Sequence, residues 1–146
     1  MSVDDDLERL RSALAVDRVT LRLDVPGMNF PVIGEALAVG IRSIRDEHTV
    51  DQRGAATAQW VLYNQQTLVQ GDVLDTDQPP PLPLIELYGV RAQMLSPVLA
   101  RASVVGWVSV HSSLPRAWSA RAIDLVEAMA GELSGKADQL MAAYRR

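Results

Sequence analysis

Two stretches late in the chain, Arg91–Leu99 and Val104–His111, alternate between apolar and mixed positions. Successive side chains of a strand point to opposite faces, so each stretch predicts a β-strand with one apolar face. The second face of an antiparallel pair is usually water-loving. Here that face is mixed, and its members include Gln93, Leu95, Trp107, Ser109 and His111. A largely apolar surface with a few polar groups is typical of a small-molecule pocket, which we therefore expect on this face.

The rest of the chain follows helical and strand periodicities in turn. Leucines at helical spacing predict an N-terminal helix, and two alternating stretches joined by a Pro-Gly turn predict a hairpin. A helix, a short edge strand, a proline-rich segment and one helical turn follow before the two late strands, which a turn of about four residues joins. The predicted ranges are Asp4–Val16, Asp17–Asp24, Pro31–Val39, Ala55–Gln65, Thr67–Val73 and Leu84–Tyr88. These elements predict an α+β fold with a central antiparallel sheet of five to six strands.

A final helix is predicted from about residue 119 to 144, with Ser119 as its N-cap. Its apolar positions alternate in steps of three and four and form a seam of three heptads, namely Ile123, Val126, Ala130, Leu133, Ala137, Leu140 and Tyr144. Gly131 and Gly135, one turn apart, would let another backbone approach. The helix is longer than the small sheet requires, so we expect its C-terminal half to form a homodimer.

Two segments allow more than one interpretation. The charged stretch Gly40–Gly54 is either a solvated connection or a loop that covers a ligand. Arg22 is either a surface residue paired with a carboxylate such as Glu35, or an inward-facing guanidinium that needs an anion. A carboxylate ligand that accepts two hydrogen bonds is the natural partner in the second case. His111 is likewise either a structural residue or a ligand contact.

Composition narrows the classes of function. The chain of 146 residues, with 48% hydrophobic and 22% charged residues, corresponds to a single globular domain over residues 1–146. Its formal charge is -4 and its basic residues are scattered, so we expect no nucleic-acid binding. It contains no cysteine, which excludes a disulfide, a thiolate metal site and a thioether-linked cofactor. With only two histidines we expect no metal site, and without a long apolar run we expect a cytoplasmic protein with no membrane contact.

Several short motifs resemble the GAF domains of phytochromes and cyanobacteriochromes, relatives of the PAS fold. The motifs are Asp17-Arg18-Val19, Val32-Ile33-Gly34-Glu35-Ala36, Gly89-Val90-Arg91-Ala92, Pro97, Val105-Gly106-Trp107, His111, Pro115-Arg116 and Trp118. The resemblance implies N-terminal and C-terminal helices on one face of the sheet and a ligand pocket on the other. It also implies that His111 and Gln93 face the pocket, and that Arg22 occupies a position where the family has an aromatic residue.

The departures from this family concern its chromophore. The attachment cysteine and the histidine beside it are missing, because Pro80–Leu84 stands in that region. The Asp-Ile-Pro segment that lies against the bilin in that family is also absent, and His48-Thr49-Val50-Asp51 does not replace it. A covalent bilin is therefore excluded, we expect no non-covalent one, and the family's thiol-dependent methionine-sulfoxide reductase activity is excluded too. The expected ligand is smaller.

Together these observations predict a stand-alone sensor or regulatory domain of the GAF type. The expected ligand is a small organic acid, an aromatic acid being one option, that passes its signal to a separate protein or across a homodimer. One alternative is an interaction or dimerisation module with a vestigial pocket, and a second is a small enzyme that uses the His111 pocket; no catalytic residue is assigned. The predicted ligand-binding residues are Arg22, Trp60, Gln93, Trp107, Ser109 and His111.

Overall fold

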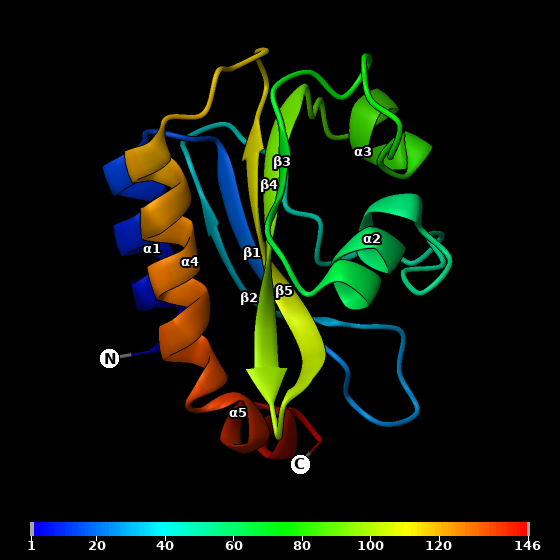
Figure 1. Ribbon diagram of the computed structural model, residues 1–146, viewed down its shortest axis with the longest axis vertical. Helices are drawn as coiled ribbons and strands as arrows, with labels where there is room; N and C mark the ends of the chain where they lie inside the picture. Colours follow the sequence, from blue (N-terminus) through cyan, green and yellow to red (C-terminus); the bar gives the residue numbers. More distant parts are fainter. Residues whose placement is uncertain (1, 146) are drawn as a thin grey trace.

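A five-stranded antiparallel sheet divides the molecule into two helical layers (Figure 1). The computed structural model describes residues 2–145, and its sheet has the strand order β2-β1-β5-β4-β3. The predicted α+β architecture is confirmed. The strands are β1 (Arg18–Leu23), β2 (Val32–Leu37), β3 (Leu68–Gln70), β4 (Ala92–Ala100) and β5 (Ser103–Ser112). The helices are α1 (Val3–Leu14), α2 (Ala56–Asn64), α3 (Leu82–Glu86), α4 (Ala120–Ser134) and α5 (Ala137–Tyr144).

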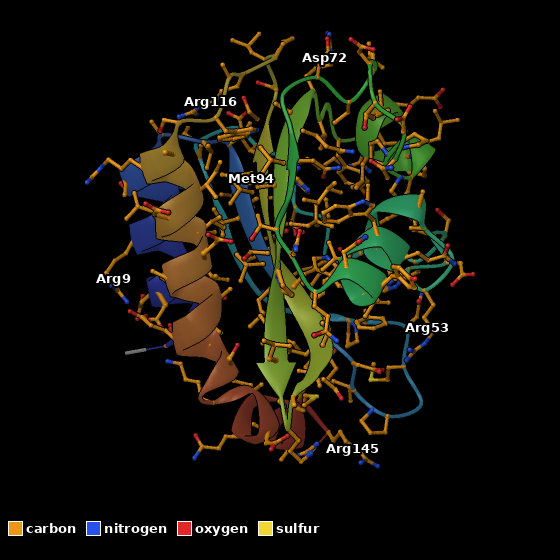
Figure 2. The ribbon with its side chains drawn as sticks, in the orientation of Figure 1. Arg9, Arg53, Asp72, Met94, Arg116 and Arg145 are labelled. Carbon is orange, nitrogen blue, oxygen red and sulfur yellow. The ribbon has the colours of Figure 1, made fainter. Side chains whose placement is uncertain are left out.

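The main hydrophobic core lies between the sheet and helices α1 and α4. Alternate residues of β1, β4 and β5 point into it, and Met94 of β4 lies between the sheet and α4 (Figure 2). Arg9 on α1 and Arg53 in the loop before α2 point outward on opposite sides of the molecule. Each fully buried valine, leucine or methionine contributes about 1.5–3 kcal/mol, so this face provides most of the stability. The N- and C-terminal helices thus share one face, as predicted.

Strand β5 approaches β1 closely at Gly106. A β-carbon added there would lie 2.0 Å from the backbone oxygen of Arg22, a distance that no real structure tolerates. Glycine is therefore required at this position for β1 and β5 to pair. The pairing sets the register in which Arg22 stands opposite Trp107, Thr20 opposite Ser109 and Arg18 opposite His111.

The other face of the sheet is covered by α2, α3 and the loop of residues 40–54. Three sets of hydrogen bonds attach this loop to β1, β2 and the connection between them. The Glu35 carboxylate accepts from Ser43 Oγ at 2.5 Å and from the Ile44 amide at 2.9 Å. Asn29 bonds Val50 and Gln52, and the Arg18 guanidinium donates to the Arg42 carbonyl. The charged segment is therefore held against the sheet, and that it covers a ligand stays a prediction.

The predicted single terminal helix is wrong, because it breaks between α4 and α5 at Gly135 and Lys136. Lys136 adopts a non-helical backbone with φ −129° and ψ 15°. Its ammonium lies 2.9 Å from the carboxylate of Asp6, which is buried in α1. This contact between residues 130 positions apart fixes the bend, after which α5 turns across the end of the sheet (Figure 1).

The heptad seam that predicted a dimer contact is used within the chain. Val126, Ala130, Leu133 and Ala137 are all buried in the main core. The seam therefore packs α4 and the start of α5 onto the sheet and α1, and it offers no apolar surface to a second subunit at these positions.

The predicted four-residue turn between β4 and β5 is also shorter than expected. Only Arg101 and Ala102 connect the two strands, and both have positive φ, at 52° and 62°. Two left-handed residues in a two-residue turn match the twist of a β-hairpin.

Candidate functional site

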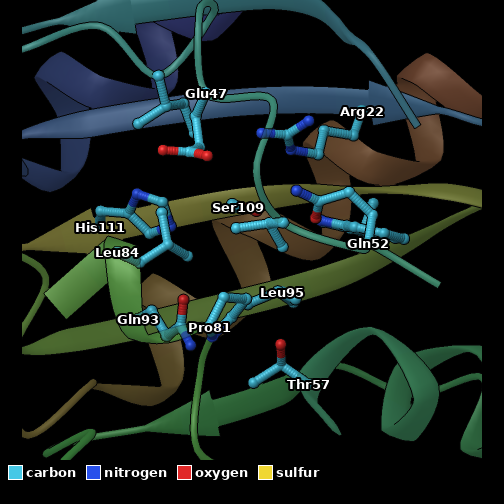
Figure 3. A pocket seen from close by; sticks show the side chains of 13 residues that line it. Arg22, Glu47, Gln52, Thr57, Pro81, Leu84, Gln93, Leu95, Ser109 and His111 are labelled. Atoms are coloured by element: carbon cyan, nitrogen blue, oxygen red, sulfur yellow. The ribbon is translucent and has the colours of Figure 1, made fainter. Parts of the chain in front are cut away.

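The predicted ligand face is a buried surface on β1, β4 and β5, which we call the polar wall. It consists of Arg18, Thr20, Arg22, Gln93, Trp107, Ser109 and His111, all of which are buried. Five of the six predicted site residues line one cavity in front of this wall, namely Arg22, Gln93, Trp107, Ser109 and His111 (Figure 3). Strand alternation and register together bring these five residues to one place.

Trp60 is the exception. It lies on α2, half-buried, and packs against the second hydrophobic cluster formed by Phe30, Ala58, Val61, Leu68, Leu95 and Trp107. It does not line the cavity among the residues described, because α2 turns this side chain toward the cluster. The structure therefore places Trp60 in the packing behind the site.

The cavity in front of the polar wall is small. Its free volume is about 20 Å³, which is room for about one water molecule. Side chains of the covering segments fill the rest of the space, among them Ile44, Glu47, Pro81 and Leu84 (Figure 3). The prediction of a cavity large enough for a ligand is therefore wrong for this conformation. The polar wall is nevertheless shielded from water, as predicted.

A second pocket of about 300 Å³ adjoins this cavity. Arg22, Glu47 and Gln52 line both spaces, so they stand at the junction between them. The remaining lining residues come from the β1–β2 connection, the first residue of β2, the covering loop and α5, namely Met28, Asn29, Pro31, Val32, Arg45, His48 and Tyr144. A volume of about 300 Å³ is at the lower end of the range for small-molecule pockets. This pocket leads from the surface to Arg22.

Arg22 is a buried cation without a counter-ion. Its side chain faces inward, the residue is 6% exposed, and Nη1 donates to the Phe30 carbonyl at 2.8 Å. Within residues 2–145 it makes no other hydrogen bond and no ion pair, since the alternative partner Glu35 bonds the covering loop instead. Burial lowers the pKa of Arg22 to about 10, partly offset by the nearby carboxylates of Glu35 and Glu47. A guanidinium in this state is prepared to bind an anion.

His111 is held as a neutral imidazole. Its Nδ1 lies 3.1 Å from Nη1 of Arg18, and because a guanidinium can only donate, Nδ1 must accept. The proton of the neutral ring therefore sits on Nε2, which makes no hydrogen bond within the described residues. Burial lowers the pKa of His111 well below its usual value, and the positive charges of Arg18 and Arg22 lower it further.

This arrangement opposes acid–base catalysis by His111. In a catalytic Ser-His pair a carboxylate orients the histidine and stabilises its protonated form. Here the orienting group is the cation of Arg18, which destabilises the protonated form, and no hydrogen bond between Ser109 and His111 occurs in residues 2–145. His111 is instead suited to donate a hydrogen bond from Nε2 into the cavity.

Gln93 has a fixed orientation. Its amide nitrogen donates to Gln70 Oε1 at 2.8 Å, and Gln70 in turn donates to Thr76 and to the Gln78 carbonyl. This chain leaves the Gln93 amide oxygen as an acceptor on the cavity side. Thr20, between Arg18 and Arg22 on β1, has a fully buried hydroxyl with no hydrogen-bond partner among the described residues. The polar wall thus contains donors and acceptors that its own side chains do not satisfy.

Several site residues were not among those predicted. Glu47 and Gln52 come from the covering loop, and Thr57 lies in the first turn of α2. The loop has no periodicity from which their direction could be predicted. Arg18 is the exception, because alternation places it on the same face of β1 as Arg22, and its spacing from Arg22 could have identified it.

The family comparison agrees with this geometry. The family model of the GAF domain matches residues 4–135. This chain belongs to the GAF domain family. No curated protein matches the sequence.

Solved GAF structures share the fold. The blue-light absorbing form of the Thermosynechococcus elongatus PixJ GAF domain aligns with a TM-score of 0.73 at 22% identity, covering 97% of this chain and 88% of that chain. The photoproduct state of GAF3 from Slr1393 of Synechocystis sp. PCC6803 gives 0.68 at 22% identity, covering 97% and 96%. A far-red cyanobacteriochrome photoreceptor gives 0.77 at 15% identity, covering 94% and 85%. At these identities the similarity establishes the fold.

The bilin of photoreceptor GAF domains does not fit this site. The sequence contains no cysteine to form a thioether bond. The space in front of the polar wall is about 20 Å³, far less than a tetrapyrrole occupies. Residues 2–145 also contain no group of three His, Asp or Glu side chains that could hold a metal ion, and no helix there is long and apolar enough to cross a bilayer.

Proposed function

We propose that this GAF domain is a sensor or regulatory domain that binds a small organic acid at Arg22. The observation that carries the proposal is the buried Arg22 guanidinium, which has a single backbone hydrogen bond and faces a pocket of about 300 Å³. A buried charge without a counter-ion destabilises a fold, and an anionic ligand bound at Arg22 would supply that counter-ion. A carboxylate can accept two parallel hydrogen bonds from a guanidinium.

Binding is coupled to the covering loop of residues 40–54. The acid enters the larger pocket, one wall of which is formed by Arg45, Glu47 and His48 of this loop. Further entry toward His111 and Gln93 requires the loop and α3 to move away from the polar wall, because their side chains fill the cavity. A ligand that contacts both Arg22 and this loop favours one position of the loop over the others, and such a population shift is the signal. A separate protein, or a second copy of this chain, recognises the loop in its ligand-bound position.

A panel of small carboxylates tests the proposal by thermal shift. At least one acid should raise the melting temperature of the wild-type protein in a concentration-dependent way, since a ligand at 100 times its Kd adds about 2.7 kcal/mol. The Arg22→Met variant should lose the response. Arg121→Met, which removes an exposed arginine from α4 on the opposite face of the sheet, should keep it. Equal responses of wild type and Arg22→Met to every acid would refute the proposal.

The small volume of the cavity favours a second candidate function, an interaction domain with a vestigial pocket. With about 20 Å³ free in front of the polar wall, the resting conformation has no room for a ligand there. In that case no acid in the panel would shift the melting temperature, and Arg22→Met would leave partner binding unchanged.

A further inference from the structure

The junction of the two pockets carries two opposite charges that form no ion pair with each other in the part of the chain described. Arg22 and Glu47 both line the cavity of about 20 Å³ (Figure 3), and both also line the pocket of about 300 Å³. Arg22 is bonded to the Phe30 carbonyl, and Glu47 is bonded to Thr49 and Tyr88. No ion pair joins Arg22 to Glu47 within the described residues. A ligand at this junction therefore meets a cation and an anion at separate points.

Glu47 is held in place for this role. Its Oε1 accepts from both the amide and the hydroxyl of Thr49, and these bonds lower the pKa of Glu47, so the group is ionised at neutral pH. Its Oε2 accepts a long hydrogen bond of 3.3 Å from the Tyr88 hydroxyl. The Tyr88 ring is itself positioned by Arg42, whose guanidinium carbon lies 4.9 Å from the ring centroid. The carboxylate is thus oriented by neutral donors and forms no ion pair within the described residues.

The other charged group at the larger pocket already has partners. Arg45 lies 3.4 Å from Asp4 and 3.9 Å from Glu35. Arg22 and Glu47 are therefore the charges left for a ligand. A simple carboxylate would satisfy Arg22 and be repelled by Glu47, whereas a ligand with an additional ammonium group would satisfy both.

We propose that the acid bound by this domain also carries a cationic amine, as an α-amino acid does, with its carboxylate on Arg22 and its ammonium on Glu47. This inference rests on the proposed function, because it requires the acid site at Arg22. The Gln52 side chain, which lines both spaces and makes no hydrogen bond within the described residues, supplies a further polar contact at the junction.

Calorimetric titration with matched pairs of ligands tests the inference. Each protein amino acid is titrated first, and each one that binds is compared with its 2-oxo acid, which has the same side chain and carboxylate but no amine. We expect the amino acid to bind about tenfold more tightly or better, the ratio that one hydrogen bond between charged groups provides. Glu47→Gln should reduce this ratio to nearly one, and Glu132→Gln, an exposed change on α4, should leave it unchanged.

The outcomes separate the two proposals. If 2-oxo acids bind as tightly as amino acids, or if Glu47→Gln leaves the ratio unchanged, the amine inference is wrong and the acid site at Arg22 stands. If neither amino acids nor 2-oxo acids bind to the wild-type protein, the inference is wrong. If no other carboxylate binds either, the proposed function fails with it.

Discussion

Replacement of Arg22 by methionine should stabilise the ligand-free protein. The methionine keeps much of the aliphatic stem and removes a buried charge that has no counter-ion. Burial lowers the pKa of Arg22 to about 10, against about 12.5 for a solvated arginine. At about 1.36 kcal/mol per pKa unit, the folded state holds this charge at a cost of about 3 kcal/mol. The charge is present in both folded and unfolded states at neutral pH, so the cost applies there in full.

The loss of the hydrogen bond to Phe30 acts in the opposite direction. It leaves a buried carbonyl oxygen without its donor, which destabilises by about 1–3 kcal/mol. The net change is an increase of about 1 kcal/mol in the free energy of unfolding, or about 2–4 °C in Tm for a domain of this size. Urea titration and thermal melting at pH 7, without added ligand, measure both quantities.

Arg18→Met is the matched control. Arg18 is 1% exposed, and its three nitrogens are all bonded, two to the Arg42 carbonyl at 3.2 and 2.6 Å and one to His111. The same chemical change there should lower the free energy of unfolding by about 2 kcal/mol or more, because it breaks an anchor of the covering loop. If Arg22→Met instead lowered stability by about 1 kcal/mol or more, Arg22 would be a structural residue and the argument for a ligand would fail.

Three further predictions concern the rest of the fold. Unfolded His111 binds a proton near pH 6.5 while the folded protein holds its pKa well below that, so stability should fall by up to about 1.4 kcal/mol per pH unit as the pH drops below 6.5. His111→Gln should flatten this slope in urea titrations at several pH values, and an unchanged slope would contradict the assignment. Asp6→Asn should lower the free energy of unfolding by about 2 kcal/mol at pH 7 and by progressively less as the pH falls below 3.8, because hydrogen bonds from Lys136 and Arg9 lower the pKa of Asp6; a loss that does not change with pH would contradict this. Gly106→Ala should destabilise by about 3 kcal/mol or more, whereas Gly131→Ala, which meets open space on α4, should stabilise by about 1 kcal/mol, and thermal melting of the pair checks both signs.

The polar wall could be predicted because a strand has only two faces. Once Val108 and Val110 are assigned to the core, Ser109 and His111 must lie on the opposite side, and antiparallel pairing brings Gln93 and Arg22 beside them. The same alternation places Arg22 on this face, but neither its burial nor its lack of a carboxylate partner could be predicted from it. That fact depends on Glu35, whose carboxylate is occupied by the covering loop.

The parts that could not be predicted depend on contacts between distant segments. The heptad pattern continues through Gly135 and Lys136, and only the ion pair with Asp6 shows why the helix ends there. The volume of the cavity depends on how far Ile44 and Leu84 reach toward the sheet, and neither lies in a periodic segment. Trp60 has an aromatic ring that suits a ligand wall, but the rotation of a short helix decides whether it faces the ligand or the core.

A crystal structure of the protein with the acid that most raises its melting temperature tests the central claim most directly. The account predicts that both carboxylate oxygens lie about 2.7–2.9 Å from nitrogens of Arg22, with the loop of residues 40–54 in contact with the ligand. An acid bound elsewhere on the molecule, with Arg22 still bonded to the Phe30 carbonyl alone, would contradict it.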